Sequence, residues 1–168
     1  MQRVLVIGPG GAGKTTFARG LAERTGLPLI HLDTLYWHAG WTPTPNDVWD
    51  RTIEQLIAHD AWIMDGNYGR TLSTRLAACD TVIFLDTSRL LSLWRVLQRR
   101  VRYRGRSRPD LPAGCPEILT WEFVAWIWTY KTRRRPGILP QLAALPSGTQ
   151  AIVLRSAREA GEFLDGLE

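Results

Sequence analysis

The chain has 168 residues, of which 45% are hydrophobic, enough for a single domain with a substantial buried core. Its apolar runs stay well short of the ~20 residues that a membrane span needs, so we expect no membrane association. The two cysteines lie far apart without metal-ligand spacing, which favours a reducing, cytoplasmic setting. The net charge of +5 comes almost entirely from arginine, whose planar fork suits phosphate oxygens.

The chain opens with a phosphate-binding loop. Residues 8–15 match the pattern G-x-x-x-x-G-K-[ST], between an apolar run at 4–7 that predicts a buried strand and a predicted helix at 16–24. Glycines let successive N–H groups turn inward and bind anions at the positive end of that helix. Lys14 is therefore a candidate catalytic group at the β- and γ-phosphates, and Thr15 a candidate Mg²⁺ ligand. The residues expected to bind ATP are Gly8, Gly10, Gly11, Ala12, Gly13, Lys14, Thr15 and Thr16.

The second strand is expected at 28–32, with Asp33 just past its carboxyl end, where open α/β sheets bind their ligands. Tyr36 and Trp37 follow at once, so we expect Asp33, Tyr36 and Trp37 to form part of an acceptor pocket. The tryptophans could equally pin the loop to the core. Thr44 is then expected to cap a helix in which Pro45 takes the first position.

A third strand is expected at 61–64, and it ends at Asp65. Asp65 is the second candidate in the Mg²⁺ site, directly or through water. An aspartate in a turn can also simply cap it. Asn67 and Arg70, which follow in the same turn, are candidate acceptor ligands.

Arginines crowd the region after the fourth strand, which is expected at 81–85. A long helix from residue 88 is predicted to bury its apolar residues and to run into a basic, proline-punctuated lid at about 102–116. A second long helix is expected from Glu117 to about Arg134, and a short one from Ile138 to Leu145. A fifth strand at 150–154 and a helix opened by a capping box at 156–159 complete the chain. The residues expected to be buried on the first long helix are Leu90, Leu91, Trp94, Leu97 and Val101.

Five apolar strands alternating with helices predict one α/β domain over residues 1–168, a parallel sheet with helices on both faces. The strand ends then bring the loop, Asp33, Asp65 and the arginine lid to one edge of the sheet. We expect a site for phosphoryl transfer there.

The opening strand–loop–helix, the Asp-Gly turn at Asp65 and the arginine lid resemble the nucleoside monophosphate kinases, adenylate kinase in particular. A closer resemblance, which covers nearly the whole chain, is to the small DNA topology modulation proteins, which are grouped with adenylate-kinase-like ATPases. The motifs that carry it lie at residues 31–37, 65–68, 108–110 and 114–117. The resemblance implies a P-loop NTPase fold with sheet order 2-3-1-4-5, ATP with Mg²⁺, and lid closure. It also implies that Arg100 lies near the nucleotide. We take Arg100 and Arg108 as catalytic arginines.

The acceptor region departs from the adenylate kinase pattern. The turn from Asp65 to Arg70 holds one residue more before its arginine and has no proline, and the arginine expected after strand two is missing. A hydroxyl acceptor benefits from a carboxylate base such as Asp33, whereas a phosphate acceptor needs arginine clamps. The pattern favours a neutral or ring-bearing acceptor, while Arg70 and the lid arginines leave room for a nucleotide.

The function expected from the sequence is ATP-dependent phosphoryl transfer to a small molecule or nucleotide, by a monomer or dimer. The alternative is a regulatory ATPase that binds nucleic acid through its arginines, in keeping with the name of the topology modulation proteins. Against that alternative, the sequence contains no recognisable nucleic-acid-binding module.

Overall fold

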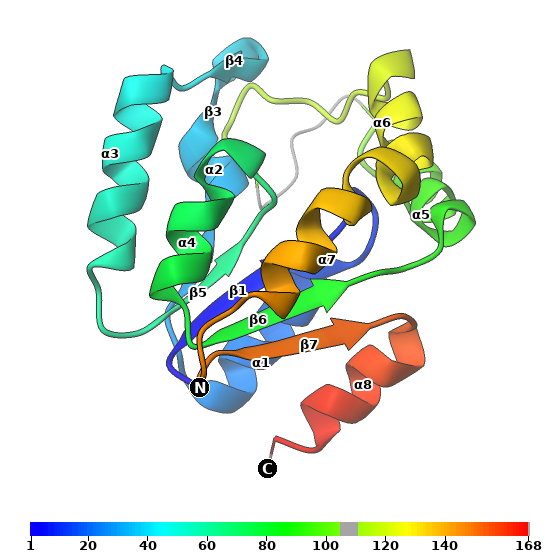
Figure 1. The fold of residues 1–168 in the computed structure, drawn as a ribbon. Coiled ribbons are helices and arrows are strands. Elements are labelled where there is room, and N and C mark those ends of the chain that lie inside the picture. Colours follow the sequence, from blue (N-terminus) through cyan, green and yellow to red (C-terminus); the bar gives the residue numbers. More distant parts are fainter. Residues whose placement is uncertain (105–110, 168) are drawn as a thin grey trace.

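The computed structural model describes residues 1–104 and 111–167, and it confirms the expected fold class (Figure 1). Every neighbouring strand pair in its five-stranded sheet is parallel. The spatial order is β2-β5-β1-β6-β7, the order 2-3-1-4-5 implied by the resemblance. These strands are β1 (Arg3–Ile7), β2 (Leu29–His31), β5 (Trp62–Asp65), β6 (Thr81–Leu85) and β7 (Gln150–Leu154).

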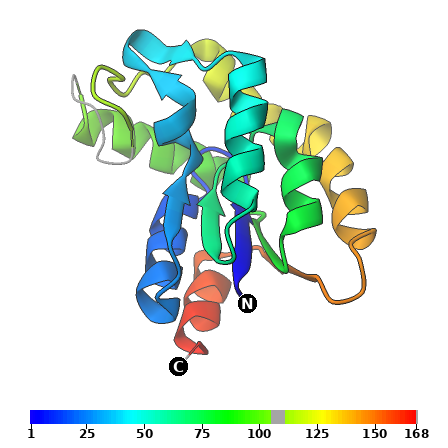
Figure 2. The ribbon, with the colours of Figure 1, turned by 90° about the vertical axis from the view of Figure 1, so that its left-hand side faces the viewer.

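Helices cover both faces of the sheet, as the view in Figure 2 shows for α1 on one side and α3 and α4 on the other. A small antiparallel hairpin of β3 (Trp37–His38) and β4 (Thr42–Pro43), not expected from the sequence, follows α2. Short 3₁₀ turns occupy Ala39–Trp41 and Gly69–Thr71. The helices are α1 (Lys14–Thr25), α2 (Leu32–Tyr36), α3 (Asn46–Ile57), α4 (Leu72–Ala78), α5 (Arg89–Arg102), α6 (Trp121–Arg133), α7 (Arg135–Ala143) and α8 (Ala157–Asp165).

Alternate residues of the central strand feed two separate cores, because successive side chains of a strand point to opposite faces. Val4 and Val6 pack with α1 and α8, whereas Leu5 and Ile7 pack with α3, α4, α6 and α7. All four side chains are buried. The phosphate loop therefore leaves β1 from the best-buried part of the molecule.

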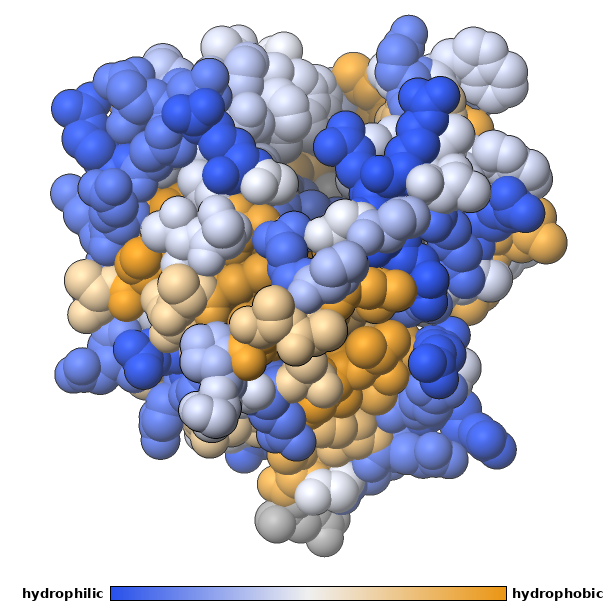
Figure 3. Space-filling model, in the orientation of Figure 1, coloured by the Kyte–Doolittle hydropathy of each residue, from blue (hydrophilic) through white to orange (hydrophobic). Residues whose placement is uncertain are grey.

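The helix α3 begins one residue later than expected, and Thr44 does not cap it. The Thr44 hydroxyl donates to the backbone oxygens of Leu35 and Tyr36 instead, which ties the end of the hairpin to α2. Pro45 takes the N-cap position, without a side-chain cap. The outer surface of α3 is hydrophilic, as the upper left of Figure 3 shows.

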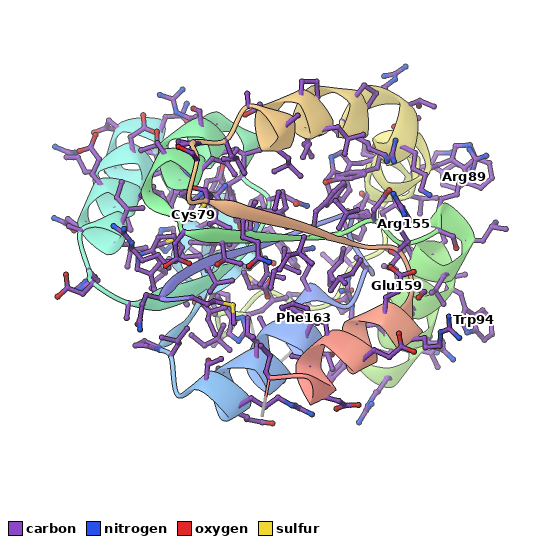
Figure 4. The ribbon with its side chains drawn as sticks, turned by 60° about the horizontal axis from the view of Figure 1, so that its bottom comes forward. Cys79, Arg89, Trp94, Arg155, Glu159 and Phe163 are labelled. Carbon is purple, nitrogen blue, oxygen red and sulfur yellow. The ribbon has the colours of Figure 1, made fainter. Side chains whose placement is uncertain are left out.

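The expectation for the buried face of α5 is wrong. Ser92 and Val96 are its buried residues. Four of the residues expected inside are exposed, and Trp94 points away from the molecule in Figure 4. Gly11 supplies the reason: a Cβ there would lie 2.2 Å from the backbone oxygen of Ser92, so the loop and α5 meet backbone to backbone. The exposed four are Leu90, Trp94, Leu97 and Val101.

The helices after the lid are displaced relative to their predicted bounds. α6 begins at Trp121, where the Thr120 hydroxyl accepts a hydrogen bond from the backbone N–H of Phe123, and residues 111–120 run as irregular chain. The kink at 134 separates α6 from α7 as expected, but α7 already begins at Arg135. None of the described helices has the length and apolar character needed to cross a membrane.

Candidate active site

The phosphate loop has the backbone of an anion cradle. Gly11 and Gly13 adopt positive φ angles of 77° and 96°, a conformation that L side chains rarely adopt. The Ala12 N–H donates to the oxygen of Pro9 (3.2 Å), and the Lys14 Nζ reaches the same oxygen at 3.1 Å. The loop thus curls around its own lysine at the N-terminus of α1, where a phosphate would meet N–H groups and the ammonium together.

Asn67, expected as an acceptor ligand, holds the start of this loop. Its Oδ1 accepts from the Gly8 N–H at 3.0 Å, and its Nδ2 donates to the Gly8 oxygen at 2.5 Å. Both hydrogen-bonding groups of the amide therefore engage the loop backbone, and through it β5 supports the shape of the cradle.

The two expected metal ligands lie together. Thr15 Oγ1 donates to Asp65 Oδ2 at 2.8 Å, and His31 Nδ1 lies 3.2 Å from the same oxygen. Asp65 is 6% exposed, and both Thr15 and Asp65 face the main cavity. Mg²⁺ is usually held by one or two protein oxygens together with phosphates and water, so a hydroxyl and a carboxylate at a phosphate loop fit this ion. His31, which β2 brings beside Asp65, was not expected here from the sequence.

Asp33 lies on the short helix α2, at the carboxyl end of β2 as expected, and it lines the cavity. The Tyr68 hydroxyl donates to Asp33 Oδ1 at 2.5 Å. Burial, together with the Asp33 charge, raises the pKa of Tyr68 far above its usual range, so this hydroxyl remains a donor. Tyr68 thus orients the carboxylate, a role that its position in the sequence does not reveal.

The aromatic residues expected at the acceptor divide into two groups. Trp37 lines the cavity, and so does Trp41, whose ring meets that of Trp37 edge to face at 5.4 Å. Tyr36 does not line it, and instead packs its ring against Trp49 and Tyr68 in the core. Tyr36, rather than a tryptophan of the loop, therefore holds this segment to the core.

Three arginines of α5 line the cavity, and Arg100 is not among them. Arg95 donates to the oxygen of Ala12 in the phosphate loop at 2.9 Å, and Arg99 pairs with the buried Glu117 at 2.7 Å. Arg102 completes this face of the helix. The i, i+4, i+7 spacing of these three residues is the sequence signal that could have selected them. Arg108 lies outside the described residues.

Arg70 lies away from the main cavity. Its guanidinium pairs with Asp50 of α3 at 2.6 Å, on the exposed side of the turn. The buried arginine of this region is Arg75, which is 0% exposed and donates to the backbone oxygens of residues 66, 67 and 68. Arg75 was not singled out by the sequence analysis, yet it sets the backbone from which Asn67 and Tyr68 extend.

The hairpin of residues 37–43 is joined to residues 114–116, the described end of the expected lid. The Gly40 N–H donates to the oxygen of Gly114 (2.9 Å), and Trp41 Nε1 donates to the oxygen of Pro116 (3.1 Å). The Cys115 thiol donates to the oxygen of His38 at 3.1 Å. We call this joined unit the cap.

All these parts surround one cavity of about 1490 Å³, which exceeds the ~300–1,000 Å³ usual for a single small ligand. The phosphate loop, Asp65, Asp33 and the α5 arginines line it together, and Ser156 and Ala157 at the start of α8 line it as well. The cavity has room for a nucleotide and a second molecule side by side.

No family model and no curated protein matches the chain. Solved structures do match it along 99% of its length. The shikimate kinase of Acinetobacter baumannii, in complex with shikimate, has a TM-score of 0.56 and 22% identity, with 90% of that chain covered. The fold is the one these kinases share. The shikimate kinase of Bacteroides thetaiotaomicron (0.56, 18%, 96% covered) and a sugar kinase from a Janibacter species (0.53, 19%, 91% covered) have it as well.

Proposed function

We propose that the protein is an ATP-dependent phosphotransferase that uses Mg²⁺ and transfers the γ-phosphoryl group of ATP to a hydroxyl group of a small molecule. The observation that carries the proposal is the shared cavity, which joins a complete phosphate loop to a carboxylate oriented by a tyrosine. The likeness to kinases of the same fold supports it. Membership of the DNA topology modulation family stays a prediction from the resemblance.

Each part has a task in the proposed reaction. The loop backbone and Lys14 bind the β- and γ-phosphates, and the arginines of α5 face the charge that develops on the transferred group. Thr15 and Asp65 would hold Mg²⁺, which neutralises phosphate charge when bound. The acceptor oxygen forms a bond to the γ-phosphorus while the bond to the β–γ bridging oxygen breaks, and ADP leaves. Asp33 accepts the proton of the acceptor hydroxyl.

The testing experiment measures ADP release from Mg·ATP against a panel of nucleosides, nucleoside monophosphates, sugars and other small hydroxyl compounds. We expect one class to stimulate turnover strongly. In Lys14→Ala the turnover should fall at least 100-fold while the circular dichroism spectrum is unchanged. In Asp33→Asn transfer should fall more than ATP binding weakens.

Two outcomes would contradict the proposal. Stimulation by DNA or RNA alone, with a steep salt dependence, would favour the regulatory ATPase. Loss of ATP binding in Asp33→Asn would assign Asp33 to the donor site instead of the acceptor.

A further inference from the structure

Two neighbouring strands bring His31 beside Asp65. β2 and β5 are parallel, and His31, the last residue of β2, is in register with Asp65, the last residue of β5. Because side chains alternate between the faces of a sheet, residues in register on parallel strands share a face. His31 Nδ1 lies 3.2 Å from Asp65 Oδ2, and the histidine side chain is 18% exposed. The Thr34 hydroxyl donates to the backbone oxygen of His31 at 2.7 Å, which fixes the end of this strand.

The two oxygens of the Asp65 carboxylate have different surroundings. Oδ2 accepts from the Thr15 hydroxyl at 2.8 Å and faces His31 Nδ1. An ionised carboxylate only accepts hydrogen bonds, so Nδ1 carries a proton in this contact and donates to Oδ2. Within residues 1–104 and 111–167, no group donates a hydrogen bond to Oδ1, and Asp65 lines the cavity. One oxygen of the carboxylate is therefore held by two protein donors, and the other is not.

His31 itself is not suited to bind Mg²⁺. Its Nδ1 is engaged with Asp65, and the residue does not line the cavity. Mg²⁺ prefers oxygen ligands, which Thr15 and Asp65 supply. A side chain that hydrogen-bonds to a metal ligand from outside the coordination sphere fixes the orientation of that ligand, and its loss typically lowers metal affinity roughly 10- to 100-fold. The contact between His31 and Asp65 has this form.

We propose that His31 is a positioning residue of the metal site, whose Nδ1–H holds Oδ2 of Asp65 so that Oδ1 remains for Mg²⁺ or its bound water. This inference rests on the proposed function, because it requires that Thr15 and Asp65 hold the Mg²⁺ that accompanies ATP. β2 continues directly into α2, which carries Asp33. The end of one strand thus supports the metal ligand and leads to the carboxylate expected to act on the acceptor.

Metal binding tests the proposal without any transfer reaction. The probe is Mn²⁺, which prefers the same oxygen ligands as Mg²⁺ and can be followed by electron paramagnetic resonance. Its dissociation constant is measured for the complex of the protein with β,γ-imido-ATP. We expect His31→Ala to raise this constant roughly tenfold. The dissociation constant of β,γ-imido-ATP measured in EDTA, which reports the phosphate loop without metal, should stay within about twofold of the wild-type value.

Further variants separate the hydrogen bond from the space that the ring fills. His31→Leu fills much of that space without a donor, and it should weaken Mn²⁺ binding as His31→Ala does. His31→Asn offers an amide N–H close to the position of Nδ1 and should keep the Mn²⁺ constant within about threefold of the wild-type value. His59→Ala, at an exposed histidine after α3, is the matched control and should change neither constant. Circular dichroism and thermal unfolding establish that each variant is folded.

The failures are distinguishable. Unchanged Mn²⁺ affinity in folded His31→Ala or His31→Leu overturns this inference and leaves the proposed function standing. An equal loss of nucleotide affinity in EDTA also overturns it, since His31 would then support the whole phosphate site, and so does an equal loss of Mn²⁺ affinity in His31→Asn. If the wild-type complex binds Mn²⁺ no more tightly than the free nucleotide does, the metal site of the proposed function fails together with this inference. Absence of transfer to every acceptor, with Mn²⁺ bound as expected, contradicts the proposed function alone.

Discussion

Arg70 and Arg75 lie five residues apart and have opposite environments. The pair of Arg70 with Asp50 is exposed, and such surface ion pairs contribute little to stability because water and salt screen them. Arg75 is buried and satisfies three backbone oxygens of the turn that carries Asn67 and Tyr68. Burial lowers the pKa of Arg75 to about 10, so its guanidinium is still charged at neutral pH.

We expect Arg75→Met to lower the free energy of unfolding by roughly 1–3 kcal/mol, because buried carbonyl groups lose their donors. Turnover of ATP should fall further than stability alone explains, since the turn positions Asn67 at Gly8 and Tyr68 at Asp33. Urea unfolding and ADP release measure the two effects. Arg70→Met is the control and should leave the free energy of unfolding nearly unchanged, because its ion pair is exposed. Equal effects of the two substitutions would show that Arg75 has no special part in the site.

At this scale the sequence predicts residues whose partners are local. The phosphate loop could be predicted because the spacing of its glycines, lysine and threonine is specific to phosphate binding. Asp33 and Asp65 could be predicted because each lies at the carboxyl end of a strand. Tyr68 and His31 could not, since their partners lie 35 and 34 residues away in the sequence. Arg75 could not, because its three acceptors are backbone oxygens, which have no signature in the sequence. Arg70 was a more conspicuous candidate in the turn than Arg75, and only its ion pair with Asp50 shows that it points away.

Among the elements, α5 shows why an apolar pattern alone can mislead. Its sequence has large apolar side chains on one face and Ser92 with Val96 on another, and hydrophobicity alone favours burial of the first. Contact with the phosphate loop demands small side chains, because Gly11 passes directly against the backbone of Ser92. The small face is therefore buried, and the arginine face is turned to the cavity. The order of the strands, by contrast, was correctly implied by the resemblance to the nucleoside monophosphate kinases.

This orientation of α5 predicts the effects of two neighbouring substitutions. Val96→Ala removes buried methyl groups and should cost roughly 1–3 kcal/mol of unfolding free energy. The neighbouring Leu97 is 48% exposed, so Leu97→Ala should change the free energy of unfolding by no more than ~0.5 kcal/mol. Thermal unfolding of both variants measures the difference. A larger cost for Leu97→Ala would mean that this face is covered in solution.

For the whole molecule, stability depends on how the central strand is anchored at its start. Asp80, just before β6, accepts hydrogen bonds from the backbone N–H groups of Gln2 and Arg3, both at 2.8 Å, and from the Thr81 hydroxyl. Burial opposes its ionisation, but these hydrogen bonds prevail and hold the pKa of Asp80 below its usual value of 3.8. The ionised carboxylate is therefore bound more tightly in the folded state than in the unfolded one.

The sign of the pH dependence follows. A carboxyl group whose pKa is lowered by folding contributes stability above its unfolded pKa, and this contribution is lost as the pH falls through the lower, folded value. We expect Asp80→Asn to destabilise the protein at pH 7, and the difference from the wild type to shrink steadily below about pH 4. Unfolding by urea at several pH values measures it. A difference that stays constant down to pH 2.5 would contradict the assignment.

The cap has a kinetic consequence. The hairpin half of the cap lines the main cavity with Trp37 and Trp41. Its other half continues to Glu117, which is paired with Arg99 of α5. Because the two halves of the cap are joined by hydrogen bonds, we expect them to move together and to open the cavity on both sides at once. We therefore expect the turnover cycle to have a single gate in place of two independent ones, so that ADP and the phosphorylated product leave in the same opening event.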